Sequence, residues 1–310
     1  MQDDTAVYLH PPVAAEFMEE VETADTKPPQ VRLAFRVAYL GTGFSGSQQQ
    51  PGIRTVEGVL IDACIRLGLI DDFRSAGFVA AGRTDANVSA LGQVVAFSTP
   101  YPERAVSNLN RMLPFDCWCT GWAQVPQDFH PRYHARSRTY RYIFPSSGLD
   151  RIAMEEASSH FVGIRDFTRL SRLEEGRDPI RFIYSSRVFA EDDVIVYEVM
   201  GKSFLWNMVR GMATLLLAAG SGLISPDRIE EIFSEKGDRI PAAPPDPLIL
   251  WDVDCGIEYH PLAPSDSSAC RFAEEERRLL TRRKMVMWLG GDRPDVPWKK
   301  EVHDKLGDLL

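Results

Sequence analysis

A regular alternation of apolar and polar residues begins at Val31 and defines the first predicted strand. Apolar or aromatic side chains occupy every second position from Val31 to Tyr39, which is the period of a half-buried β-strand. A glycine-rich segment follows, and Thr55 then precedes a stretch whose apolar positions repeat every three to four residues. That period, with a threonine at the N-cap, predicts a helix over residues 56–67.

The remaining patterns predict a mixture of strands, hairpins and helices. Strands are expected at 93–98, 139–144 and 248–253, with a hairpin over 188–200. Helices are expected at 103–112 and 205–219, after Ser225-Pro226, and at 271–289. Hairpins that alternate with helices favour an α+β fold around a mixed, largely antiparallel sheet. Both halves of the chain run through a similar order of strand, helix and strand.

The charge of the 310-residue chain is distributed unevenly and suggests four segments. The formal net charge is −9, of which residues 1–30 carry −6 and residues 265–310 carry +1. We therefore expect an acidic, mobile arm at 1–30, two body halves at 31–150 and 151–264, and a helical extension at 265–310. Since phosphate responds to the local field and not to total charge, the mildly acidic body can still hold a basic groove.

The five cysteines are odd in number and include no C-x-x-C pair. This usage predicts reduced thiols in a cytoplasmic protein and gives no support to a metal site. The most apolar stretch, residues 211–224, is too short to cross a bilayer, so no membrane partner is expected.

Two charged residues far apart in the chain are candidates for a single site. Asp85 lies in a loop after Gly82, where a lone aspartate is usually a turn or cap residue. Arg210 lies on the predicted helix 205–219, which is apolar nearly all round and therefore buried. A buried guanidinium needs an anion, either a structural acid or a catalytic one. Pairing with Asp85 would keep that carboxylate ionised and oriented.

Residues 129–142 form a third candidate site, because four arginines and three tyrosines occur there without any acid. Basic residues interleaved with aromatic ones suit a polyanion whose bases can stack. The candidate binding residues in this stretch are Arg132, Arg138 and Arg141.

These stretches resemble the tRNA pseudouridine synthase A family. Residues 82–86, Gly-Arg-Thr-Asp-Ala, with the strand at 92–97, are similar to its signature. Residues 129–142, 203–210 and 248–250 resemble its later motifs in the same order, so the resemblance covers residues 31–258. Three positions depart from the family pattern: Ser47, Asn87 and Ser89 stand where Trp, Gly and His are usual.

The resemblance implies an isomerase that converts uridine to pseudouridine at positions 38–40 in the anticodon arm of tRNA. It implies no metal and no other cofactor, a homodimer, and a cleft between two related α+β halves (the pseudouridine synthase fold). Asp85 matches the essential aspartate, which either attacks the ribose C1′ or takes the proton from C2′.

The resemblance also assigns roles around Asp85. Arg210 orients the carboxylate, and Tyr140 stacks on the uracil while its hydroxyl helps to remove the C5 proton. Arg83 fills the gap left when the target base is flipped out. Leu248 and Leu250 form an apolar floor for the base.

Two other interpretations remain open from the sequence. A glycoside hydrolase would need a second carboxylate about 5–9.5 Å from Asp85. A tRNA-binding protein that kept the fold and lost catalysis would bind tRNA without turnover.

Overall fold

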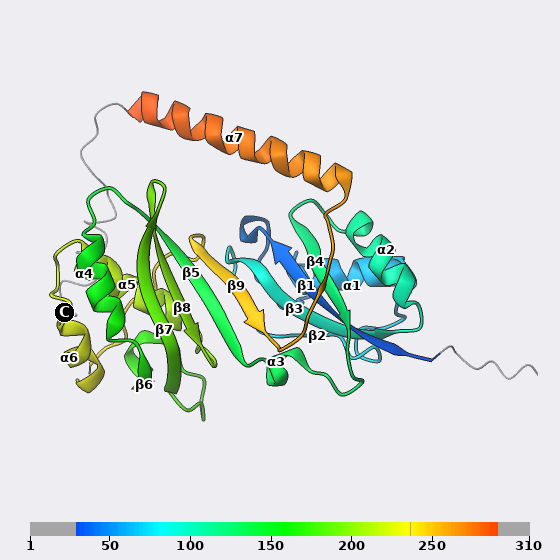
Figure 1. The fold of residues 1–310 in the computed structure, drawn as a ribbon, viewed down its shortest axis with the longest axis horizontal. Helices are drawn as coiled ribbons and strands as arrows, with labels where there is room; N and C mark the ends of the chain where they lie inside the picture. The colour runs from blue at the N-terminus through cyan, green and yellow to red at the C-terminus, as the bar shows by residue number, and fades with distance from the viewer. Residues whose placement is uncertain (1–28, 236, 291–310) are drawn as a thin grey trace, which may run out of the picture.

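Ten strands form one sheet in the computed structural model, which describes residues 29–235 and 237–290 (Figure 1). The strands are β1 (Val31–Tyr39), β2 (Val79–Ala80), β3 (Ser89–Thr99), β4 (Cys117–Gln124), β5 (Ser137–Pro145), β6 (Gly163–Asp166), β7 (Ile180–Glu191), β8 (Val194–Gly201), β9 (Leu248–Asp254) and β10 (His260–Pro261). The α-helices are α1 (Val56–Arg66), α2 (Pro102–Met112), α3 (Pro131–His134), α4 (Arg151–Ser159), α5 (Met208–Gly220), α6 (Arg228–Ser234) and α7 (Asp266–Gly290). Short 3-10 helices lie at η1 (Gly41–Gly43) and η2 (Thr168–Leu170). The fold is α+β with a mixed, largely antiparallel sheet, as the sequence predicts.

The strand order β10-β4-β1-β3-β9-β5-β8-β7-β6 divides the sheet into two antiparallel parts, and β2 pairs with β3 outside this order. One part contains β1, which lies between β3 and β4. The other contains β5, which lies between β8 and β9. The two parts meet where β3 and β9 run parallel over two residue pairs, Ser89–Ile249 and Ala90–Leu250. This short parallel seam brings the start of β3 next to β9 and β5.

Each part of the sheet has its own hydrophobic core, and the two cores exchange residues across the seam. Leu250 and Val253 of β9 and the following Cys255 pack into the first core, although the other buried residues of that core come from positions before 130. Val88, just before β3, packs into the second core with Leu248. The two halves are therefore interlocked by burial as well as by backbone hydrogen bonds.

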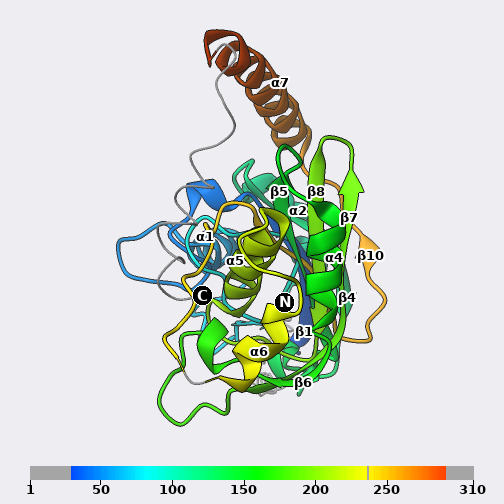
Figure 2. The same ribbon diagram turned by 90° about the vertical axis from the view of Figure 1, so that its left-hand side faces the viewer.

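Helices α1 and α5 lie on the same side of the sheet, one against each half (Figure 2). Helix α7 runs across the upper edge of the molecule and extends over both halves (Figure 1). It touches the body through Phe272, whose ring meets that of Trp118 edge-on, and through an ion pair between Arg283 and Asp193. No helix within residues 29–235 and 237–290 is both long and apolar enough to span a membrane.

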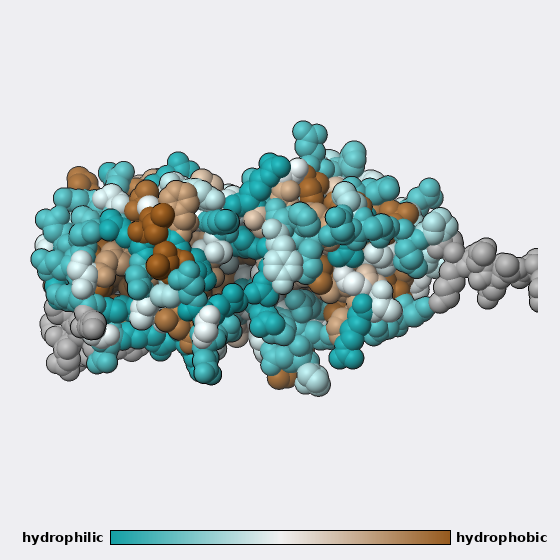
Figure 3. All heavy atoms as spheres, turned by 90° about the horizontal axis from the view of Figure 1, so that it is seen from below, coloured by the Kyte–Doolittle hydropathy of each residue, from teal (hydrophilic) through white to brown (hydrophobic). Residues whose placement is uncertain are grey.

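The lower surface is mostly hydrophilic, with apolar side chains gathered over its left-hand half (Figure 3). Strands β6 and β7 lie there, and Ile164 and Phe182 face one another as cross-strand partners on them. The side chain of Ile164 is 72% exposed and that of Phe182 is 44% exposed. This apolar strip lies at the edge of the sheet, in the half that does not contain Asp85.

Most predicted elements are confirmed, with two differences at helix starts. The predicted helix 205–219 begins at Met208, because Asn207 has a left-handed φ of 65° that an α-helix cannot contain. The helix expected to open at Ser225-Pro226, with Ser225 as its N-cap, begins instead at Arg228, and Ser225 and Pro226 belong to the preceding turn. The predicted acidic arm at 1–30 falls almost entirely outside the described residues, as does the end of the 265–310 extension.

Candidate active site

A pocket lies between the two halves and contains the predicted pair of charged residues. The side chains of Asp85 and Arg210 meet there, with 2.9 Å between Arg210 Nη1 and Asp85 Oδ2. The Asp85 side chain is 31% exposed and that of Arg210 is 17% exposed. The pocket is lined by Arg83, Thr84, Asp85, Val88, Tyr140, Phe204, Leu205, Trp206, Asn207, Val209, Arg210 and Leu248. The two residues therefore form one partly shielded site, although 125 positions separate them.

The Asp85 loop is fixed by close packing against the glycine-rich loop that follows β1. A Cβ added to Gly41 would lie 2.4 Å from backbone atoms of Asn87, so only glycine permits this approach. On the other side of Asp85, the Tyr39 hydroxyl is 2.8 Å from the hydroxyl of Thr84. The backbone on both sides of Asp85 is thus held in place before any substrate arrives.

The three departures from the family pattern all contribute to the shape of this loop. The buried Ser47 hydroxyl accepts a hydrogen bond from the Thr84 N–H at 2.8 Å. Asn87 adopts a left-handed φ of 67°, which asparagine tolerates better than most residues. The Ser89 hydroxyl accepts from the Gly41 N–H at 3.0 Å. The altered residues therefore join the two loops to each other.

Arg210 is held by a buried helix and by the chain segment that precedes β9. It lies in the first turn of α5, and most residues of that helix are buried. Its Nε donates to the Ala243 carbonyl at 2.6 Å, and the Ala243 N–H donates to the Arg210 carbonyl at 3.1 Å. Its Nη1 also donates to Asn207 Oδ1 at 3.0 Å. These bonds leave the guanidinium one main direction, toward Asp85.

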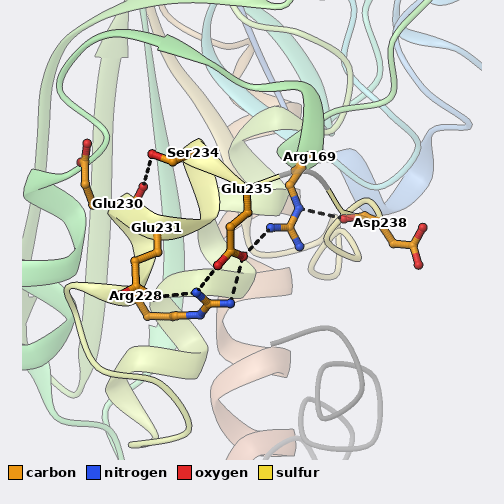
Figure 4. Close-up of polar contacts among 7 residues, drawn as sticks. All are labelled: Arg169, Arg228, Glu230, Glu231, Ser234, Glu235 and Asp238. Atoms are coloured by element: carbon orange, nitrogen blue, oxygen red, sulfur yellow. Dashed lines mark hydrogen bonds and ion pairs between the residues drawn. The ribbon is translucent and has the colours of Figure 1, made fainter.

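The segment carrying Ala243 is anchored at its start by the charged network in Figure 4. Arg169 Nε donates to the Asp238 carbonyl at 3.1 Å, and the Ile240 N–H donates to the Arg169 carbonyl at 2.7 Å. Glu235 accepts from Arg228 at 2.6 and 3.0 Å and also lies 3.5 Å from Arg169. This network ties the support of Arg210 to α6.

Tyr140 places an aromatic ring in the pocket from strand β5. Its ring meets that of Phe204 edge-on, with 5.0 Å between centroids. Burial raises the pKa of Tyr140 to about 12, and the nearby Arg138 guanidinium offsets only part of that rise. The phenol is therefore neutral at ordinary pH. Tyr142, two residues along the same strand, is buried and donates to the Pro244 carbonyl at 3.1 Å.

The other residues predicted from the sequence are placed unevenly around the pocket. Leu248 and the exposed Arg83 line it. Leu250 is 1% exposed, packs into the first core, and is not among the lining residues. The structure therefore does not bring Leu250 to the pocket surface.

The three candidate binding arginines of strand β5 and helix α3 differ in what they contact. Arg132 is exposed. Arg138 donates to the carbonyls of Ala81, Arg132 and Lys202, and so ties three segments together. Arg141 donates to Glu198 at 2.7 Å and lies over the Trp251 ring, 3.6 Å from its centroid. Two of the three guanidinium groups are thus already engaged by the protein.

Trp206 and Asn207 are site residues that the sequence interpretation missed. The Trp206 indole N–H donates to Asp85 Oδ1 at 3.0 Å, so each carboxylate oxygen has one donor. The sequence places both residues on a helix, where Trp206 would pack among apolar neighbours. The Asn-Met step at 207–208 is the available signal, since asparagine favours helix starts and left-handed turns.

The pocket does not supply the groups that the glycosidase interpretation needs. Asp85 is the one carboxylate among the described residues that line it. The described part of the chain also contains no group of three or more His, Cys, Asp or Glu side chains placed to hold a metal ion.

Comparison with known proteins gives close relatives. A family model described as tRNA pseudouridine synthase matches residues 157–254. A protein named tRNA pseudouridine synthase A from Methanosphaerula palustris is 47% identical over 281 residues, which is 90% of this chain and 100% of that protein. Proteins of the same name from Methanoculleus marisnigri and Thermococcus sibiricus are 47% and 42% identical, over 86% and 84% of this chain and 99% of each relative.

The solved structures found are much less similar. One described as a Cbf5-Nop10-Gar1 complex has 14% identity and a TM-score of 0.33, and covers 60% of this chain and 45% of that chain. A TM-score of this size carries no argument about this chain. The sequence relatives are similar over nearly their whole length, and on that ground the chain belongs to the tRNA pseudouridine synthase A family of isomerases.

Proposed function

We propose that the chain isomerises uridine to pseudouridine at positions 38–40 of the tRNA anticodon arm, with Asp85 as its essential catalytic group. The observation that carries this proposal is the Asp85 carboxylate, held by Arg210 and Trp206 in a pocket between the two halves. In the reaction the bond between ribose C1′ and uracil N1 breaks, the uracil turns, and C5 joins C1′. The proton leaves C5 and N1 gains one, so the product is an isomer.

Asp85 has two possible roles that fit this geometry. Its carboxylate oxygen can attack C1′ and release the uracil, or it can take the proton from C2′. Both routes require an anionic oxygen in a site that excludes bulk water. Arg210 supplies the opposite charge at 2.9 Å and fixes the direction of the carboxylate.

Tyr140 is proposed to stack on the uracil. Its ring lines the pocket, and its pKa of about 12 keeps the hydroxyl protonated at neutral pH. A protonated phenol is a donor and not a ready base, which favours stacking over direct removal of the C5 proton. A Tyr140→Phe variant would separate the two, since it keeps the ring and removes the hydroxyl.

The remaining pocket residues are proposed to receive the flipped base and the strand around it. Leu248 offers an apolar wall, and Leu250 supports that wall from the core behind it. The exposed Arg83 is placed to enter the gap that the flipped base leaves. Of the β5-region arginines, exposed Arg132 is the better candidate for phosphate contact, while Arg138 and Arg141 act by shaping the strand.

We also infer from the family a homodimer that works in the cytoplasm, with the anticodon arm of tRNA as its partner. The five cysteines are all free thiols, which is typical of proteins in reducing compartments. Sedimentation of the purified chain at several concentrations tests the dimer.

The function is tested by release of tritium from tRNA labelled at uridine C5. We expect release by the native chain and none above background from Asp85→Asn, with tRNA affinity retained. Retained release in the variant would remove Asp85 from the mechanism. A native chain that binds tRNA with no release would instead be the inactive binding protein.

A further inference from the structure

Trp206 lies in a turn whose geometry aims its indole ring at Asp85. The Met208 N–H donates to the Leu205 carbonyl at 3.1 Å, and Asn207 has a φ of 65°. The turn therefore ends just before α5 and keeps Trp206 out of the helix. From this position the indole Nε1 donates to Asp85 Oδ1 at 3.0 Å, opposite the oxygen bound by Arg210.

Arg172 holds Trp206 from the outer side. Its guanidinium carbon lies 4.3 Å from the centroid of the Trp206 ring, and its backbone N–H donates to the Trp206 carbonyl at 2.8 Å. Nearby Arg165 and Arg169 are instead taken by carboxylates of the α6 region, Glu230 and Glu235. Among the described residues no carboxylate pairs with Arg172, so its charge remains over the ring.

Two donors on two oxygens restrict the carboxylate more than one donor can. With Arg210 alone, the Asp85 carboxylate can rotate about the bond to its Cβ while keeping one contact. A second donor from a different segment blocks that rotation and fixes which oxygen lone pairs face the pocket. Trp206 is 44% exposed, so water can compete for this bond unless the ring is held in place.

We propose that Trp206 is a positioning residue for Asp85, and that Arg172 clamps its ring in the productive orientation. This inference rests on the proposed function of Asp85. It assigns Trp206 an effect on turnover and little effect on tRNA binding, because the indole N–H contacts the carboxylate and not the substrate.

The first test observes the hydrogen bond without any reaction. The six tryptophans should give six indole N–H signals in a two-dimensional 1H–15N correlation NMR spectrum. The signal that is lost in Trp206→Phe identifies the indole of residue 206. We expect Asp85→Asn to move that signal upfield, since a neutral acceptor replaces a charged one, while the Trp251 signal stays in place. An unchanged Trp206 signal overturns the proposal.

The second test separates turnover from binding. Trp206→Phe keeps an aromatic ring under Arg172 and removes the N–H donor together with the pyrrole part of the indole, a loss of volume that the Trp251→Phe control shares. We expect kcat to fall about 10- to 100-fold, the loss of one hydrogen bond to a charged group, with KM within about twofold. Arg172→Met should lower kcat by a smaller factor, because it frees the ring without removing the donor.

Trp251→Phe is the matched control. Trp251 also carries an arginine on its ring, Arg141 at 3.6 Å, but its indole is not bonded to Asp85. Its kcat should equal that of the native chain. A normal kcat in Trp206→Phe, or an equal loss in Trp251→Phe, overturns the positioning role. If the native chain releases no tritium the proposed function fails, whereas the indole signal still reports on the bond.

Discussion

The two charged partners of the pocket are held in opposite ways. Asp85 stands on a loop fixed by short backbone contacts to Gly41 and by small polar side chains such as Ser47. Arg210 stands on a buried helix, and its long side chain is guided by Asn207 and Ala243. Tight backbone packing of the loop positions Asp85, whereas hydrogen bonds along the flexible side chain position the guanidinium of Arg210. The two sides should therefore fail under different substitutions.

The largest effect is expected on the arginine side. Arg210→Met keeps much of the side-chain volume and removes the donor to Asp85, so we expect kcat to fall about 100-fold or more. The tRNA affinity should change far less, since the guanidinium contacts the carboxylate and not the RNA. Single-turnover tritium release and filter binding measure the two quantities.

Arg36→Met is the control for this prediction. Arg36 on β1 pairs with Asp252 on β9 at 2.8 Å, so it makes an ion pair of similar length outside the pocket. Its removal should cost only what a partly exposed pair contributes, about 0–1 kcal/mol of stability. Comparable losses of turnover and affinity in Arg210→Met would count against an orienting role.

An added methyl group should distinguish the packing that supports the Asp85 loop from the packing of helix α5, which carries Arg210. In Gly41→Ala the new Cβ would meet backbone of Asn87 at 2.4 Å, and in Gly211→Ala it would meet the Leu170 carbonyl oxygen at 2.4 Å. Overpacking of this kind costs about 1–3 kcal/mol. Only Gly211 lies inside an α-helix, where alanine recovers about 1 kcal/mol of propensity. Chemical denaturation should show a larger loss of stability for Gly41→Ala, and equal losses would contradict the comparison.

The smallest effects should come from the two left-handed asparagines. Asn87→Gly keeps the backbone conformation on the Asp85 side and should change stability by less than about 0.5 kcal/mol, with normal kcat. Asn207→Gly keeps a similar conformation but removes the acceptor of Arg210 Nη1 at 3.0 Å. We expect kcat to fall about threefold to tenfold. A normal rate in Asn207→Gly would show that Ala243 alone guides the guanidinium.

Alternation and helical period predicted the elements that build the pocket. Strand β1 has the predicted bounds, and Thr55 caps α1 by accepting from the Gly58 N–H. The requirement that an arginine on a buried helix has an anion predicted a partner for Arg210, with Asp85 as one candidate, and the structure shows the two side chains 2.9 Å apart. That requirement does not depend on knowing the intervening fold.

Contacts that depend on the direction of one side chain could not be predicted from the periodic patterns. Trp206 looks like one more apolar residue of a buried helix until the turn at Asn207 is known. Arg141 looks like a phosphate ligand, yet Glu198 from the neighbouring strand occupies it. Helix α4 was missed although Asp150 caps it, because its apolar stripe is short. Only the partner of Arg141 is distant in sequence, whereas Trp206 and α4 depend on a local turn and a short helix whose sequence patterns are weak.

Because each core contains residues from the other half, the packing across the seam also constrains the order in which the chain can fold during its synthesis. The N-terminal core is closed by Leu250, Val253 and Cys255, which are synthesised long after its other buried residues. A nascent chain emerging from the ribosome therefore keeps an open N-terminal core until β9 has been synthesised. We therefore expect the N-terminal half to finish folding only late in translation, although most of its residues emerge first.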